Sequence, residues 1–140
     1  MISQKDYFGV KMDNPEATLE MKANASAMLS KVNELLKYAA LDGHYKSPID
    51  PDTGTQVSGS RGGAGDGGFR LSTSTTGASK SQHRKARAVD VYDPANLLDN
   101  WLTDEILEEF QLYRETPTAT NGWCHLQDIP PGSGRRTYMI

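Results

Sequence analysis

Three side chains that can bind a divalent cation lie in two short stretches of the sequence. His83 and Asp90 fall within SQHRKARAVDV (81–91), and His125 falls within WCHLQ (123–127). Zinc in catalytic sites uses ligands of these types, with three protein side chains leaving a fourth position open for water. The residue types therefore suit a metal centre, whereas ordinary surface histidines are the alternative interpretation of the same spacing.

The elements expected around these residues could bring them together. ARAVDVYD (86–93) alternates apolar residues as a strand does, and TNGWCHLQ (120–127) is expected to form the final strand. His83 would then lie at a loop–strand junction, Asp90 inside one strand and His125 inside the other. Adjacent strands can bring such side chains to zinc–ligand distances of about 2.0–2.2 Å.

The other reactive or charged residues have simpler interpretations. Cys124 neighbours His125, but strand alternation turns it to the opposite face, where we expect a core residue. His44, just after the first long helix, is expected to be solvated or to cap that helix. A basic patch, either a solvated loop or a surface for an anionic polymer, comprises Lys80, Arg84, Lys85 and Arg87.

Composition indicates one small globular domain. The chain has 140 residues, of which 36% are hydrophobic and 24% charged, enough for a single core. A net charge of −3 argues against a dedicated nucleic-acid-binding protein, and one cysteine excludes an internal disulfide. We expect no membrane partner, because no apolar run approaches the roughly 20 residues that span a bilayer. We expect no signal peptide, because the N-terminal stretch carries Asp6 and Asp13 and lacks an apolar segment. Synthesis in a cytoplasm is expected.

Helical patterning is clearest over residues 15–41, where apolar residues recur every three or four positions. We expect Asn14 to cap this helix and Gly43 to end it with a left-handed conformation. Two shorter helices are expected over 94–102 and 104–114.

Turn-forming residues dominate from 47 to 76, which predicts either a flexible linker or two short strands, at 55–61 and 69–73. An N-terminal arm is expected over 1–14 and an extended C-terminal tail over 128–140. The order of elements indicates a single α+β domain.

Three sequence blocks resemble the signature motifs of the M15 family of zinc peptidases. The blocks are SGSR (58–61), TGASKSQHRKARAVDV (76–91) and WCHLQ (123–127). They follow the family's order of S-G-[aromatic]-R, G-x-x-x-S-x-H-x-x-G-x-A-x-D and W-x-H, and the resemblance spans roughly residues 19–127. The matching positions are Ser58, Gly59, Arg61, Gly77, Ser81, His83, Ala88, Asp90, Trp123 and His125.

The resemblance implies a function as well as a fold. The family comprises D-Ala-D-Ala carboxypeptidases, L-alanyl-D-glutamate endolysins and their phage relatives, built on a small domain with a mostly antiparallel sheet and flanking helices. It implies that His83, Asp90 and His125 bind Zn²⁺, and that Arg61 stabilises an oxyanion or grips a substrate carboxylate. The expected substrate is a peptidoglycan stem peptide, and the expected origin is a phage or prophage. The protein would be made in the host cytoplasm or carried on the virion, and would act at the bacterial cell wall.

The sequence departs from this pattern at three positions. Ser60 replaces the aromatic residue, and Ala86 replaces a glycine, which a loop without a left-handed requirement would accept. Gly122 stands where many members carry the general base. Glu115 is the first substitute we expect for that base, and Asp128 the second. The alternative is a catalytically silent M15-like structural or binding module of a phage particle.

Overall fold

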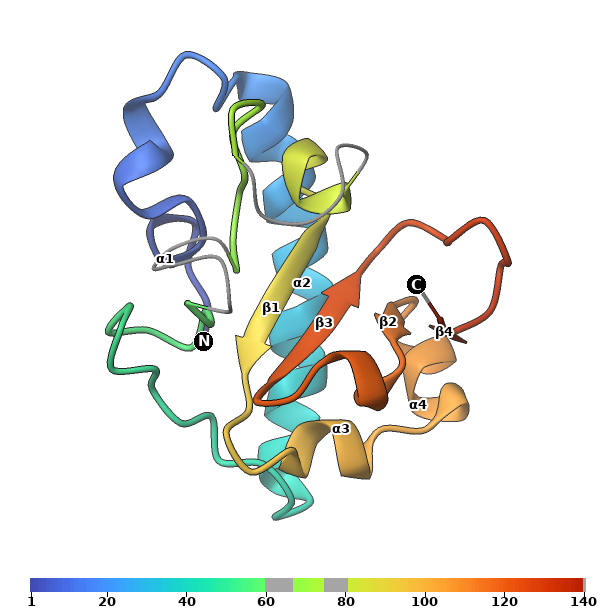
Figure 1. Cartoon of the computed structure of the whole chain (residues 1–140). Helices are drawn as coiled ribbons and strands as arrows, with labels where there is room; N and C mark the ends of the chain where they lie inside the picture. Colours follow the sequence, from blue (N-terminus) through green and yellow to red (C-terminus); the bar gives the residue numbers. More distant parts are fainter. Residues whose placement is uncertain (60–66, 75–80, 140) are drawn as a thin grey trace.

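A long helix and a four-stranded sheet form the two main layers of the protein (Figure 1). The computed structural model describes residues 1–59, 67–74 and 81–139. The long helix, α2 (Leu19–Leu41), runs behind the sheet in Figure 1. The strands are β1 (Ala88–Tyr92), β2 (Tyr113–Glu115), β3 (Trp123–Gln127) and β4 (Thr137–Tyr138).

The sheet has the order β1-β3-β2-β4. The β1–β3 and β3–β2 pairs are antiparallel, and only the β2–β4 pair is parallel. A small α+β fold with a mostly antiparallel sheet is thus confirmed.

Helix α2 begins four residues later than the sequence pattern predicts. The hydroxyl of Thr18 accepts a hydrogen bond from the N–H of Met21 at 3.2 Å and so caps the helix. Asn14 instead accepts from the N–H of Glu16 within the preceding turn. Gly43 follows the helix with φ of +77°, as predicted. The buried stripe that faces the core comprises Ala25, Met28, Leu29, Val32, Leu35, Leu36 and Ala39.

The N-terminal segment packs into the core, so the expected arm is not found. Residues Gln4–Phe8 form α1 and Gly9–Asp13 form a short 3-10 helix, η1. The rings of Tyr7 and Phe8 are buried, and the Tyr7 hydroxyl donates a 2.8 Å hydrogen bond to the carbonyl of Ala88. The segment therefore supports the beginning of β1.

The expected strands before β1 are replaced by loops. Among the described residues 47–59, strand-like pairing is limited to two isolated bridges, Asp50–Thr55 and Val57–Val91, and residues 69–73 form no strand. Loop backbone nevertheless covers the free edge of β1. Asp90 donates its N–H to the carbonyl of Gly67 at 2.7 Å, and its carbonyl accepts from the N–H of Ser58 at 2.8 Å.

Two glycines allow this loop to approach β1 and α1 closely. A Cβ atom on Gly67 would lie 2.0 Å from the carbonyl oxygen of Ser58, and one on Gly68 would lie 2.0 Å from that of Tyr7. No side chain fits at either position without a backbone shift, which is the situation that selects glycine.

The C-terminal half contains more strand than expected. Helices α3 (Leu97–Trp101) and α4 (Asp104–Glu109) are present, and the Thr103 hydroxyl caps α4 by accepting a hydrogen bond from the N–H of Ile106. The second helix is shorter than the predicted 104–114, because Gln111 adopts φ of +58° and β2 begins two residues later. The tail is not simply extended, since it returns to the sheet as β4.

Candidate metal centre

One polar residue from each strand lies in a row across the sheet. Asp90 of β1 pairs with His125 of β3, and Glu115 of β2 pairs with Tyr138 of β4. The antiparallel register of β2 and β3, extended by one residue, sets Glu115 opposite His125. Paired residues direct their side chains to the same face of a sheet, so the four strands supply one polar row.

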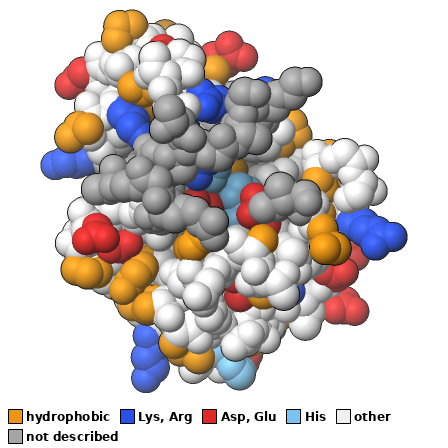
Figure 2. Space-filling view, in the orientation of Figure 1, with side chains coloured by type: hydrophobic (Ala, Val, Ile, Leu, Met, Phe, Trp, Pro, Cys, Tyr) orange, Lys and Arg blue, Asp and Glu red, His pale blue; other side chains and the backbone are white. Residues whose placement is uncertain are grey.

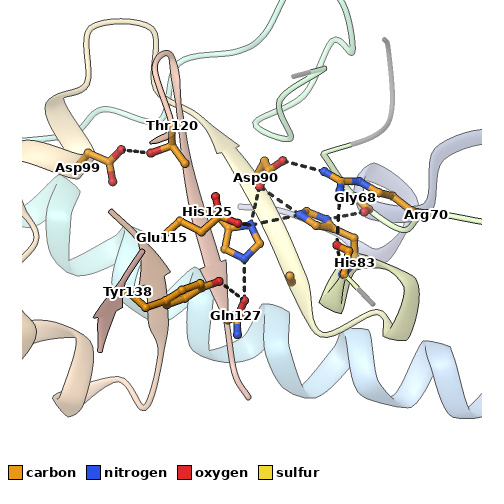
Figure 3. Close-up of polar contacts among 12 residues, drawn as sticks. Gly68, Arg70, His83, Asp90, Asp99, Glu115, Thr120, His125, Gln127 and Tyr138 are labelled. Carbon is orange, nitrogen blue, oxygen red and sulfur yellow. Dashed lines mark hydrogen bonds and ion pairs between the residues drawn. The ribbon is translucent and has the colours of Figure 1, made fainter. Parts of the chain in front are cut away.

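The fifth residue, His83, comes from the 3-10 helix η2 (Gln82–Lys85) just before β1. Figure 3 shows its ring directed toward Asp90 and His125. The hydroxyl of Ser81 accepts from the N–H of His83 at 3.3 Å, and this contact orients the turn.

The turn after His83 requires a left-handed residue. Ala86 ends η2 with φ of +56° and ψ of +35°. The expectation that this loop has no left-handed requirement was therefore wrong. An L-residue with a Cβ atom is strained there, which explains why glycine would suit the position.

The three candidate ligand atoms lie at nearly equal separations. Nε2 of His83 is 3.2 Å and Nδ1 of His125 is 2.9 Å from Oδ1 of Asp90, and the two nitrogens are 3.3 Å apart. Ligands at 2.0–2.2 Å from a tetrahedral zinc ion are about 3.3–3.6 Å from one another, slightly farther apart than these three atoms. A small outward shift would therefore accommodate one small cation, and the buried triad can hold a metal ion.

Each imidazole ring forms a hydrogen bond through the nitrogen that faces away from Asp90. In the neutral ring, the other nitrogen then carries a lone pair that faces Asp90. Nδ1 of His83 is 2.9 Å from the carbonyl oxygen of Gly68, and Nε2 of His125 is 2.8 Å from Oε1 of Gln127. Both oxygens can only accept, so the outer nitrogens carry the hydrogens. With both rings neutral, two imidazole lone pairs and Oδ1 of Asp90 thus converge, and a proton on His125 or a metal ion would satisfy them.

Burial and charge act in opposite directions on these groups. Burial would raise the pKa of Asp90, but the two histidines lower it well below its usual value. Burial lowers the pKa of His83. Burial also opposes a charge on His125, yet hydrogen bonding to Asp90 and the nearby carboxylates give it a raised pKa. Asp90 therefore stays ionised in a buried site, which favours a cation.

A buried arginine holds the second oxygen of Asp90. Nη2 of Arg70 lies 3.3 Å from Oδ2, whereas Oδ1 faces the histidines, so the ion pair leaves the inward oxygen available. The sequence did not point to Arg70; the arginine named from it, Arg61, lies outside the described residues. Gly68, Phe69 and Arg70 follow one another in the order glycine, aromatic residue, arginine. The block SGSR (58–61) lacks this order, because Ser60 occupies its aromatic position.

The two carboxylates named as candidate bases occupy different surroundings. Oε1 of Glu115 lies 3.8 Å from Nδ1 of His125, on the ligand side of the ring. Asp128 forms a 2.8 Å ion pair with Arg87 instead. Gly122 lies in the turn before β3 with φ of +95°, where a glutamate would be strained. Of these positions, Glu115 alone contacts the triad.

The site lies just below the protein surface. The exposed fractions of His83, Asp90 and His125 are 1%, 2% and 4%. Figure 2 shows histidine and acidic atoms in the middle of the face that it presents. Glu115 is more accessible, with 19% of its side chain exposed.

A second buried carboxylate lies on the opposite side of the sheet. Asp99 of α3 accepts a 2.8 Å hydrogen bond from the hydroxyl of Thr120, and Nη1 of Arg114 lies 3.5 Å from its other oxygen. Cys124 is buried on this face too, as predicted from strand alternation, and His44 is exposed beside Asp42.

Comparisons with known proteins add no assignment. No protein-family model matches the chain, and no curated protein or solved structure matches it. Among the described residues, no helix has the length and apolar character needed to cross a membrane. The geometry of the site is therefore the observation from which a function can be inferred.

Proposed function

We propose that this protein is a zinc-dependent peptidase that cleaves an amide bond in peptidoglycan stem peptides. The observation that carries the proposal is the mutual spacing of the three ligand atoms, 2.9–3.3 Å, with a carboxylate from the next strand at 3.8 Å. The resemblance of three sequence blocks to M15 peptidases supplies the substrate class.

The donor set suits zinc among the common divalent cations. Nε2 of His83, Nδ1 of His125 and Oδ1 of Asp90 would hold the ion, and two imidazoles with one carboxylate are a usual zinc set. Zinc bound there supplies a Lewis acid that activates water and polarises a carbonyl group. Magnesium and calcium prefer sites made entirely of oxygen ligands.

Glu115 is the residue that we assign as general base. Pairing of β2 with β3 holds it beside His125, and its partial exposure leaves it accessible to a substrate. Its carboxylate would take a proton from the attacking water and pass it to the leaving amine. The base thus comes from the strand beside His125, whereas the family pattern places it at Gly122.

The arginines would have separate duties. Arg70 holds the outer oxygen of Asp90 and so fixes the direction of the inward oxygen. Arg61 keeps the role that the resemblance implies, which is to balance the charge that develops on the carbonyl oxygen or to bind a substrate carboxylate.

The biological setting follows from the same resemblance. A phage or prophage product would be made in the host cytoplasm and would act on the bacterial wall during lysis or as part of the virion. Its partners would then be stem peptides and virion proteins, and we propose no nucleic-acid or membrane partner.

The proposal is tested by measuring zinc content and new amine ends on purified peptidoglycan. We expect about one equivalent of zinc and release of amine ends that a chelator stops and added zinc restores. His83→Ala should lose both zinc and turnover, and His44→Ala, at an exposed histidine outside the site, should lose neither. Folded wild-type protein that takes up no zinc contradicts the proposal.

A catalytically silent binding module is the second candidate, and Gly122 at the usual base position favours it. Glu115→Gln separates the two functions. If Glu115 is the base, this variant should keep its zinc and lose about 10²–10⁴-fold in kcat. If the protein is a silent module, the wild type and Glu115→Gln should both bind zinc and peptidoglycan, and neither of the two proteins should release amine ends.

A further inference from the structure

A hydrogen-bonded chain behind His125 is not used by the reaction proposed above. Oε1 of Gln127 accepts from Nε2 of His125 at 2.8 Å and from the hydroxyl of Tyr138 at 2.6 Å. Figure 3 shows the three side chains in sequence, on the side of His125 that faces away from Asp90. Gln127 is 3% exposed, so these contacts are made away from solvent.

The amide nitrogen of Gln127 fixes the orientation of the whole amide group. Nε2 of Gln127 donates a 2.7 Å hydrogen bond to the carbonyl oxygen of Ile129. A flipped amide would set two carbonyl oxygens against each other there, so the oxygen of Gln127 must face His125 and Tyr138. An amide oxygen only accepts, and Nε2 of His125 must therefore carry the hydrogen.

Strand β4 delivers Tyr138 to this position. The N–H of Arg114 donates to the carbonyl of Arg136, and the N–H of Thr116 donates to that of Tyr138, both at 2.8 Å. The guanidinium of Arg136 lies 4.3 Å from the centre of the Tyr113 ring. The ring of Tyr138 stands edge-on to that of His125, with the two centroids 6.4 Å apart.

We propose that Gln127 and Tyr138 are positioning residues that hold the His125 ring with its Nδ1 lone pair directed at the cation. This inference rests on the proposed metal centre. Tyr138 orients Gln127, Gln127 fixes the hydrogen on Nε2 of His125, and Nδ1 is left to bind. Partners behind a ligating histidine fix its tautomer and raise its basicity, and their loss typically costs about 10–100-fold in metal affinity.

The experiment measures zinc affinity by competition with a chromophoric chelator, in variants that change this chain one atom group at a time. Gln127→Leu removes the acceptor, Gln127→Glu retains an acceptor oxygen, and Tyr138→Phe removes one hydroxyl. Tyr45→Phe is the matched control, because its hydroxyl donates to the carbonyl of Tyr92, outside the site. Circular dichroism and thermal unfolding show that each variant is folded.

We expect Gln127→Leu to weaken zinc binding about 10–100-fold and Tyr138→Phe to weaken it less. Gln127→Glu keeps an acceptor for His125 but sets a carboxylate oxygen against the Ile129 carbonyl, so it should lose stability and retain more zinc affinity than Gln127→Leu. Tyr45→Phe should lower stability with unchanged zinc affinity. In the zinc-loaded wild type, ring-nitrogen NMR spectra should show His125 coordinated through Nδ1.

Two results would overturn the inference. One is unchanged zinc affinity in folded Gln127→Leu and Tyr138→Phe, and the other is coordination of His125 through Nε2. Either result leaves the peptidase proposal standing if peptidoglycan is still cleaved. Conversely, the expected affinities in a protein that cleaves nothing would support the positioning role and refute the proposed function. Wild-type protein without zinc affinity overturns both.

Discussion

Two buried aspartates lie on opposite faces of the sheet and differ in what surrounds them. Asp99 is 2% exposed, with the hydroxyl of Thr120 and the guanidinium of Arg114 as its neighbours. Asp90 is equally buried, yet its inward oxygen faces two imidazole nitrogens whose hydrogens are directed elsewhere.

The difference separates a structural carboxylate from a candidate metal ligand. Asp99 accepts a hydrogen bond from Thr120 on Oδ2, and its Oδ1 lies 3.5 Å from the guanidinium of Arg114 without a hydrogen-bond partner among the described residues, so donor groups of the protein and no converging lone pairs face this carboxylate. Lone pairs surround the inward oxygen of Asp90, and only a proton or a metal ion can bring three acceptors together. Burial of a carboxylate is therefore a weak indicator of a site, whereas an excess of converging acceptors is a strong one.

The largest expected effect is on metal binding. Asp90→Asn replaces a charged ligand with a neutral amide and should weaken zinc affinity by more than about 100-fold, beyond the loss for an outer partner. Asp99→Asn should leave the affinity unchanged. Isothermal titration with zinc measures both. Similar losses in the two variants would remove the distinction between these aspartates.

A smaller effect is expected on stability when the arginine of the second cluster is removed. Arg114 donates to the backbone carbonyls of Asp99 and Leu102 in addition to its ion pair. Arg114→Leu leaves a buried carboxylate without its cation, which costs about 3–5 kcal/mol of unfolding free energy. Urea unfolding in the presence of a chelator measures this loss of unfolding free energy. A cost below about 1 kcal/mol would show that Asp99 needs no cation.

The two aspartates should also give opposite pH dependences in metal-free protein, the smallest effect expected. The pKa of Asp90 is lowered, so its contribution to stability is present above the unfolded value, about 3.9, and is lost as pH falls through the folded pKa. Burial raises the pKa of Asp99, so its contribution is present below about 3.9 and is lost as pH rises through the folded pKa.

Urea unfolding from acid to neutral pH in the presence of chelator tests this contrast. In Asp99→Asn, the unfolding free energy should fall less than in the wild type as pH rises. In Asp90→Asn, the unfolding free energy should fall less than in the wild type as pH falls. The same slope in both variants would contradict the assignment of opposite shifts.

The elements with a periodic sequence were the ones that could be predicted. Strand β1, strand β3 and the apolar stripe of α2 follow local patterns of two and about 3.6 residues per repeat. His83, Asp90 and His125 could be named because their types and their motif order are visible without knowing the fold.

Other parts of the site depend on pairing between distant segments. Strands β2 and β4 have three and two residues, too few for a periodic signal. Glu115 and Tyr138 reach the site only through the register of those strands, so sequence could name Glu115 without locating it and missed Tyr138 altogether. Arg70 was missed because an arginine in a glycine-rich segment gives no sign that it is buried.

The row of side chains across the sheet has a consequence for how the protein reaches its native form. Sliding β3 by one residue against β1 would turn His125 toward α2 and bring Cys124 to the opposite face. Much apolar contact would survive such an error, but the ion could not bind. A metal ion held by the triad would therefore stabilise one strand alignment over its near neighbours, and refolding with and without added zinc should then differ in how many misaligned chains persist.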